Sequence, residues 1–137
     1  MLYDTIPISL RRCILSEKPE KVVIFPCSGG SNCGQIANQV AVTLTTEGAC
    51  NMSCLAGIGA HDQKMIDSAR SAKTILAIDG CAVACVKKAL EHAGIEVTKW
   101  ICVTEEGIKK TAGKFNIAPE EVTRIAHLAK ETIAQPI

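Results

Sequence analysis

The stretch from Thr74 to Cys85, TILAIDGCAVAC, constrains the fold of this chain more than any other. It begins as an apolar run of strand length and reaches a turn at Asp79-Gly80. A helical pattern follows, with apolar residues expected on one face at Val83, Val86 and Leu90. The stretch therefore predicts a buried strand that passes directly into a helix. Cys81 would lie at the junction and Cys85 one helical turn later, with both thiols on one face.

The same alternation of strand and helix recurs along the chain. Further strands are expected at 22–25, 50–55 (a weaker one) and 97–103, and further helices at 35–44, around 65–69, and from Pro119 to Ile133. Asn32 and Gln35 have the spacing of a capping box at the start of the first helix. Four rounds of strand then helix predict an α/β three-layer sandwich with a four-stranded parallel sheet. The favoured strand order is 2-1-3-4, as in flavodoxin- and Rossmann-like sheets.

Length and charge narrow the class of protein. The 137 residues suit a single α/β domain, 1–137, with an irregular N-terminal segment at 1–20. A net charge of +1 and only four aromatic residues give no reason to expect a nucleic-acid partner. No apolar run is long enough to span a bilayer and no signal peptide is evident. We therefore expect a cytoplasmic protein without a membrane partner, whose protein or small-molecule partner the sequence does not identify.

Eight cysteines are the unusual part of the composition. In a cytoplasmic chain with a core of its own, they are expected to bind metal, to carry redox chemistry, or to be buried as small apolar residues. Burial is the expectation for Cys13, for Cys102 within the fourth strand, and for Cys50 at the far end of the strand from Cys54. Cys33, near the start of a helix, is left open between an additional ligand, a redox partner and a residue without a role.

The remaining cysteines fall where the predicted topology brings strand ends together. Cys27, Cys54 and Cys81 each follow a strand, and in the order 2-1-3-4 those three strands are neighbours. Cys85 can supply a fourth sulfur, and four thiolates suit a tetrahedral zinc ion. Helix N-termini facing the site would offset part of the thiolate charge. An iron–sulfur cluster is the alternative metal centre, and a thiol redox or sulfur-transfer site is the alternative chemistry.

Three separated motifs give this chain a family resemblance. They are CSGGSN with GQIA at 27–37, CLAGIG at 54–59, and Asp79-Gly80-Cys81 with Cys85. In this order they resemble the DGC domain, a family named for its Asp-Gly-Cys motif, expected to bind zinc and without an established biochemical activity. The resemblance implies chelation by Cys27, Cys54, Cys81 and Cys85. Typical members carry an apolar residue where this chain has Cys33.

Other readings of the same residues are weaker. A cysteine that opens a small-residue loop before a helix is typical of low-molecular-weight phosphatases and arsenate reductases, but the arginine that such loops need is absent. We therefore lean away from an enzyme. His61 is a candidate additional ligand or proton shuttle, although a solvated loop histidine is the ordinary outcome. Asp79 is expected to shape its turn, or to accept a hydrogen bond beside the metal.

Overall fold

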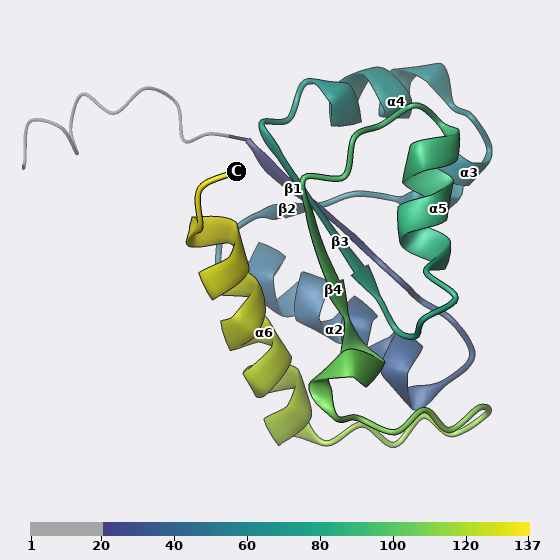
Figure 1. The fold of residues 1–137 in the computed structure, drawn as a ribbon, viewed down its shortest axis with the longest axis vertical. Coiled ribbons are helices and arrows are strands. Elements are labelled where there is room, and N and C mark those ends of the chain that lie inside the picture. The colour runs from purple at the N-terminus through teal and green to yellow at the C-terminus, as the bar shows by residue number, and fades with distance from the viewer. Residues whose placement is uncertain (1–20) are drawn as a thin grey trace, which may run out of the picture.

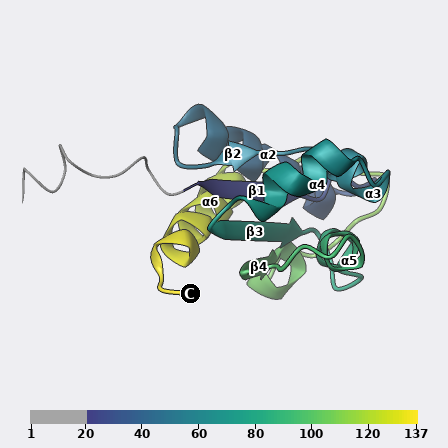
Figure 2. The same ribbon diagram turned by 90° about the horizontal axis from the view of Figure 1, so that it is seen from above.

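Four parallel strands form one sheet in the order β2-β1-β3-β4. In the computed structural model, which describes residues 21–137 (Figure 1), the strands are β1 (Val22–Pro26), β2 (Asn51–Met52), β3 (Thr74–Asp79) and β4 (Lys99–Cys102). Figure 2 shows them in this order from top to bottom. The expected α/β sandwich with strand order 2-1-3-4 is confirmed. The irregular segment expected at 1–20, with Cys13, lies outside the described residues.

Five α-helices and a short 3-10 helix connect and cover the strands in this part of the chain. They are α2 (Asn32–Thr46), α3 (Leu55–Gly59), α4 (Gln63–Arg70), α5 (Cys85–His92), η2 (Val103–Glu106) and α6 (Pro119–Ala134). The crossover between β2 and β3 therefore holds two helices where the sequence predicted one. Each strand is joined to the next strand along the chain by a crossover that contains at least one helix, which is why the chain alternates between strand and helix.

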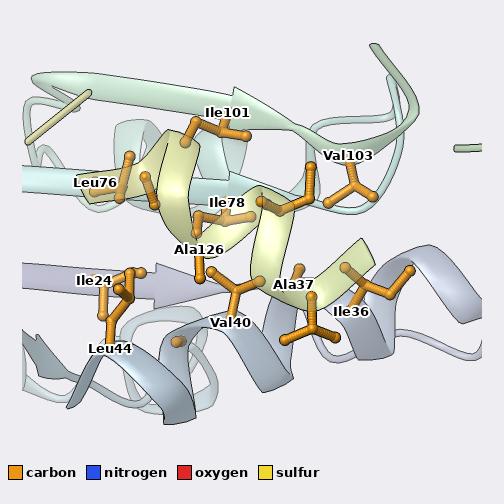
Figure 3. Close-up of a cluster of buried hydrophobic side chains, with 14 of the residues drawn as sticks. Ile24, Ile36, Ala37, Val40, Leu44, Leu76, Ile78, Ile101, Val103 and Ala126 are labelled. Carbon is orange, nitrogen blue, oxygen red and sulfur yellow. The ribbon is translucent and has the colours of Figure 1, made fainter. Parts of the chain in front are cut away.

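The two faces of the sheet bury separate sets of side chains. Along β1 and β3, Ile24, Leu76 and Ile78 point to the face that α2 and α6 cover (Figure 3). Val23, Phe25, Ile75 and Ala77 alternate with them and pack with residues of α3, α4 and α5 on the other face. All six residues of β3 are buried, as expected for a strand with a helical layer on both sides. Burial of each large aliphatic side chain contributes about 1.5–3 kcal/mol, so the sheet's central strands anchor both cores.

Two of the strands are shorter than the sequence predicted. The strand expected at 50–55 is reduced to Asn51 and Met52, both exposed, although the Ser53 amide still donates to the Ile24 carbonyl oxygen at 3.0 Å. β4 covers Lys99–Cys102 rather than 97–103. Both are edge strands with a single hydrogen-bonded neighbour, which limits how far pairing continues.

The helix after β3 begins four residues later than predicted. Residues Cys81–Ala84 form a turn, and Ala84 takes up a left-handed conformation, with φ 57°, before α5 starts at Cys85. The expectation that Cys81 and Cys85 share one face of a helix is therefore wrong. Val83, expected to face the core, is 54 % exposed on this turn. No helix within residues 21–137 has both the length and the apolar character needed to cross a bilayer.

Candidate functional site

Three of the predicted site cysteines lie just beyond the carboxyl ends of three adjacent strands. Cys27 directly follows β1, whereas Cys54 and Cys81 each lie two residues beyond β2 and β3. The order β2-β1-β3 makes these strands neighbours, so the three cysteines follow adjacent strands at the same end of the sheet. We call this end of the sheet, with the segments that follow β1, β2, β3 and β4, the carboxyl edge.

Cys27 opens the loop between β1 and α2 and is half-buried. Its amide donates to the Ile78 carbonyl oxygen at 2.8 Å, which extends the pairing of β1 with β3 by one residue. The Gly29 amide donates to the Cys27 sulfur at 3.3 Å. The loop therefore places a backbone hydrogen-bond donor beside the Cys27 sulfur, the kind of neighbour that metal-ligating side chains generally have.

Three glycines let the loop, α2 and the turn after β3 approach one another closely. A Cβ on Gly34 would lie 2.8 Å from both the nitrogen and the oxygen of Gly29, and a Cβ on Gly80 would lie 2.8 Å from the Gly34 nitrogen. These are backbone atoms that cannot rotate away, so only glycine fits at Gly34 and Gly80. The contact brings Cys81, the residue after Gly80, to the start of α2.

Asp79 holds the start of α5 through a buried carboxylate that is 1 % exposed. Its Oδ1 accepts from the Val86 amide at 2.8 Å, and its Oδ2 accepts from the Lys87 amide at 3.2 Å and from Trp100 Nε1 at 2.9 Å. The first amides of a helix have no partner within the helix, and a carboxylate here also meets the positive end of the helix dipole. Asp79 therefore fixes the two ends of the turn that carries Cys81, as its expected turn-shaping role requires.

Cys81 is half-buried and lies beside a lysine that the sequence reasoning missed. Lys110 Nζ donates to the Cys81 sulfur at 3.4 Å. An ammonium group at this distance can balance part of the charge of a thiolate. The contact joins residues 29 positions apart in the chain, and no local pattern in the sequence indicates it.

The loop that carries Lys110 is fastened to the start of α2. The Asn32 side chain donates to the Lys109 carbonyl oxygen at 2.8 Å and accepts from the Thr111 amide at 2.7 Å. Ser31 and Ala112 form an antiparallel bridge beside these bonds, and Figure 1 shows the loop running along the start of α2. Asn32 is thus not the cap of α2, as the capping-box pattern suggested. Ser31 is the cap, and its hydroxyl accepts from the Gly34 amide at 3.1 Å.

Cys33 and Cys102 also reach the carboxyl edge, but from inside the protein. Cys33 is fully buried in the first turn of α2, and its thiol donates to the Ile108 carbonyl oxygen at 3.6 Å. Burial raises the pKa of the Cys33 thiol, and negative charge on Cys81 raises it further. Cys102 ends β4 and is buried with its sulfur 3.3 Å from the Thr104 hydroxyl oxygen. Both are thiols of the core rather than of the surface.

Cys50 has the structural position that the sequence predicted. It lies before β2, in the core between the sheet and α2, and is 5 % exposed. Burial raises the pKa of its thiol, while a hydrogen bond from Thr45 lowers it. A protonated, buried thiol of this kind behaves as a small apolar side chain.

The remaining candidate site residues, Cys54, Cys85 and His61, lie beside the helices α3 and α5. Cys54 and Cys85 are exposed at the starts of α3 and α5, two helices that contact each other. His61 lies at the far end of this pair, with its ring 5.2 Å from the ring of His92. Because His92 ends α5, His61 lies about 10 Å along the helix axis from Cys85.

The described residues do not form a closed metal site as they stand. All seven cysteines within residues 21–137 are free. In that part of the chain, no three side chains of histidine, cysteine, aspartate or glutamate converge where they could hold one ion. The donor set at the carboxyl edge therefore fits a thiophilic metal in chemistry, and the fourfold ligation of such an ion requires the cysteine-bearing segments to draw together.

A pocket lies at the opposite end of the sheet, away from this chemistry. It has a volume of about 270 Å³ and is lined by residues at the amino ends of β3 and β4, among them Arg70, Ile75 and Thr98. None of its lining residues is a cysteine. The carboxyl edge is accordingly the functional candidate, because it gathers the reactive side chains.

Comparison with known proteins identifies a matching family. Residues 23–128 match the family model described as the DGC domain. A protein of Pseudomonas aeruginosa, the "Anaerobic and virulence modulator AnvM", is 38 % identical over 92 residues, which cover 67 % of this chain and 70 % of that protein. A comparison with solved structures gives no significant match.

Proposed function

This chain belongs to the DGC domain family, and we propose that it is a regulatory metal-binding protein that holds one zinc ion through Cys27, Cys54, Cys81 and Cys85. The observation that carries the proposal is the placement of Cys27, Cys54 and Cys81 beyond the carboxyl ends of three adjacent strands. Cys85 begins the helix that follows the turn holding Cys81. All four thiols are half-buried or exposed, so a metal ion from solution can reach them.

The surroundings of these thiols suit a metal–thiolate centre. Four thiolates around Zn²⁺ carry a net charge of −2, which a protein site has to offset. The Gly29 amide at the Cys27 sulfur and the Lys110 ammonium group at the Cys81 sulfur are placed to do so. Asp79 positions the turn of Cys81 by hydrogen bonds to α5 and to Trp100 rather than by contact with the ion.

Zinc binding would draw the carboxyl edge together. The turn Cys81–Ala84 contains no buried residue, and Cys54 is itself exposed between β2 and α3. Neither segment has to leave a packed core in order to move. The free energy of metal binding is therefore available to order these loops, as in other proteins whose sites close around the ion.

A site with four protein ligands leaves no open position for water or substrate, which favours a structural or sensory role over catalysis. The relative AnvM is named as a modulator. We infer a regulatory role in which the loading of the site changes the shape of the carboxyl edge, the surface formed by the loops after the strands.

The proposal is tested by comparing ligand and control cysteines. Zinc affinity, measured by competition with a chromophoric chelator, should fall by more than about tenfold in each of the ligand variants Cys27→Ser, Cys54→Ser, Cys81→Ser and Cys85→Ser. Cys50→Ser and Cys102→Ser change buried thiols outside the proposed ligand set. These two variants should retain the wild-type zinc affinity. An equal loss in the two sets would refute the ligand assignment.

A further inference from the structure

Cys33 is the thiol at the carboxyl edge that the proposed zinc site does not use. It lies in the first turn of α2, is fully buried, and faces the segment that follows η2. A Cβ on Gly80 would lie only 3.0 Å from the carbonyl carbon of Cys33. Standard bond lengths then place the Cα atoms of Cys33 and Gly80 within about 6 Å of each other. Cys81 is the next residue.

The same short segment contacts both thiols. The Cys33 thiol donates to the Ile108 carbonyl oxygen at 3.6 Å, and Lys110, two residues later, donates to the Cys81 sulfur at 3.4 Å. Asn32 fastens this segment through Lys109 and Thr111, so its position relative to α2 is fixed. Both sulfurs thus contact the segment 108–110, Cys33 through the backbone of Ile108 and Cys81 through the side chain of Lys110, although they come from different elements.

Cys81 and Cys102 are the cysteines whose charges act on the Cys33 thiol, and they differ in exposure. After burial, the negative charge of Cys81 is the largest contribution that raises the pKa of Cys33, and Cys102 contributes less. Cys102 is buried, whereas Cys81 is half-buried and open to a small oxidant.

We propose that a peroxide converts Cys81 and Cys33 into a reversible disulfide, and that this bond takes Cys81 away from the metal. In the first step, the Cys81 thiolate attacks one peroxide oxygen, the O–O bond breaks, and Cys81 becomes a sulfenic acid with release of hydroxide. In the second step, the Cys33 sulfur attacks the Cys81 sulfur, and the hydroxyl group leaves with the Cys33 proton as water. Two thiols and one hydrogen peroxide thus give one disulfide and two waters.

The structure assigns the two cysteines different parts in this reaction. Cys81 is accessible to the oxidant and has the Lys110 ammonium group 3.4 Å from its sulfur, which places it as the attacking cysteine. Cys33 is shielded from solvent and is therefore protected from direct attack by the oxidant. A disulfide needs Cα atoms about 4.4–6.8 Å apart. The turn Cys81–Ala84, which has no buried residue, is the part that can adjust to reach this separation.

The disulfide is tested on full-length, metal-free, reduced protein treated with an equimolar amount of hydrogen peroxide and then alkylated. Before alkylation, the wild type should lose the mass of two hydrogen atoms. After alkylation, tandem mass spectrometry should locate a Cys33–Cys81 link that dithiothreitol reverses. Cys33→Ser and Cys81→Ser should abolish the link, whereas Cys50→Ser, a change at another buried thiol, should retain it. A link between another pair, or a sulfinic acid on Cys81 without any link, would overturn the proposal.

The effect on the metal rests on the proposed zinc site and has its own readout. In zinc-loaded protein, peroxide should release zinc in step with formation of the Cys33–Cys81 link, and Cys33→Ser should slow the release by more than about tenfold because Cys81 then has no resolving thiol. If the metal-free protein forms the Cys33–Cys81 link but does not bind added zinc, the zinc site is refuted and the disulfide proposal stands. Zinc release at the wild-type rate in Cys33→Ser would refute the coupling between them.

Discussion

Gly80→Ala should destabilise this protein although it adds a single methyl group. The new Cβ would lie 2.8 Å from the Gly34 nitrogen, 2.9 Å from the Gly34 Cα and 3.0 Å from the Cys33 carbonyl carbon. Carbon atoms in ordinary contact lie about 3.5–4.0 Å apart, so the turn after β3 and the start of α2 would have to separate by roughly half an ångström or more. The obstructing atoms belong to the backbone of a helix packed on the sheet, and no side-chain rotation can relieve the clash.

The expected cost follows from overpacking. Inserting a methyl group into a close-packed interior costs about 1–3 kcal/mol. The free energy of unfolding falls by about 2 kcal/mol per molar urea, so a loss of about 2 kcal/mol in that free energy lowers the urea midpoint by about 1 M. The separation would also move Cys81 from Cys33, so Gly80→Ala should reduce the yield of the disulfide between them.

Gly30→Ala is the matched control in the same region. A Cβ on Gly30 would meet no atom within 4 Å. Its effect on the free energy of unfolding should stay within about 0.5 kcal/mol, or be slightly stabilising because alanine restricts the unfolded chain. Urea titrations of both variants, followed by circular dichroism, give the comparison. Equal midpoints for Gly80→Ala and Gly30→Ala would refute the argument from close glycine contacts.

Three further predictions address the capping, the loop and the buried thiols. Asp79→Asn should lower the free energy of unfolding by about 1.5–3 kcal/mol, because a buried carboxylate with three N–H donors is replaced by an amide with one acceptor oxygen. Urea titration followed by Trp100 fluorescence measures this loss. The control Asp67→Asn, at an exposed position, should cost less than about 0.5 kcal/mol. Asn32→Ala removes both side-chain bonds to Lys109 and Thr111, so trypsin should cut after Lys109 and Lys110 faster than in the wild type, and an unchanged rate would contradict the role given to Asn32. Finally, the pKa of Cys33 and of Cys50 is raised above the ordinary value of 9.0, so folding favours the protonated thiols and stability should fall as the pH rises above that value. The fall, measured as the urea midpoint against pH, should be shallower in Cys33→Ala and in Cys50→Ala, and an identical slope in the wild type and both variants would rule out this linkage.

The parallel sheet could be predicted because local patterns determine it, and the order 2-1-3-4 is the one that flavodoxin- and Rossmann-like sheets favour. The apolar run from Thr74 to Ile78, entirely buried in β3, and the alternation of strand and helix limit the chain to a parallel sheet with crossovers. The placement of Cys27, Cys54 and Cys81 follows from that order alone. The edge strands were overestimated because the apolar residues at 50–55, and the apolar and β-branched residues at 97–103, fit a strand whether or not a partner strand continues beside them.

The turn after β3 was missed because its cause is not local. Cys81–Ala84 has the composition of a helix, but Asp79 caps the amides of Val86 and Lys87, which fixes the start of α5 at Cys85. The carboxylate can do so only because Trp100 of β4 holds it from the other side. Lys110 at Cys81 was likewise beyond sequence reasoning, since the pairing of Asn32 with Lys109 and Thr111 sets its position.

The Asp-Gly-Cys motif gains a physical explanation from these contacts. The aspartate caps α5, the glycine permits the close approach to α2, and the cysteine presents a half-buried thiol beside Lys110. Each residue type is required at its position for a different reason. The motif therefore identifies a turn at the carboxyl edge whose conformation and contacts these three residues determine.

The most direct test of the proposed function is the metal content of the protein purified without oxygen, measured together with acid-labile sulfide and the visible spectrum. A four-cysteine zinc site should give about one zinc ion per chain, no sulfide and no colour. A brown protein containing iron and sulfide would contradict zinc as the metal and indicate an iron–sulfur cluster on these thiols. Metal-free protein that does not bind added zinc would contradict the metal site itself.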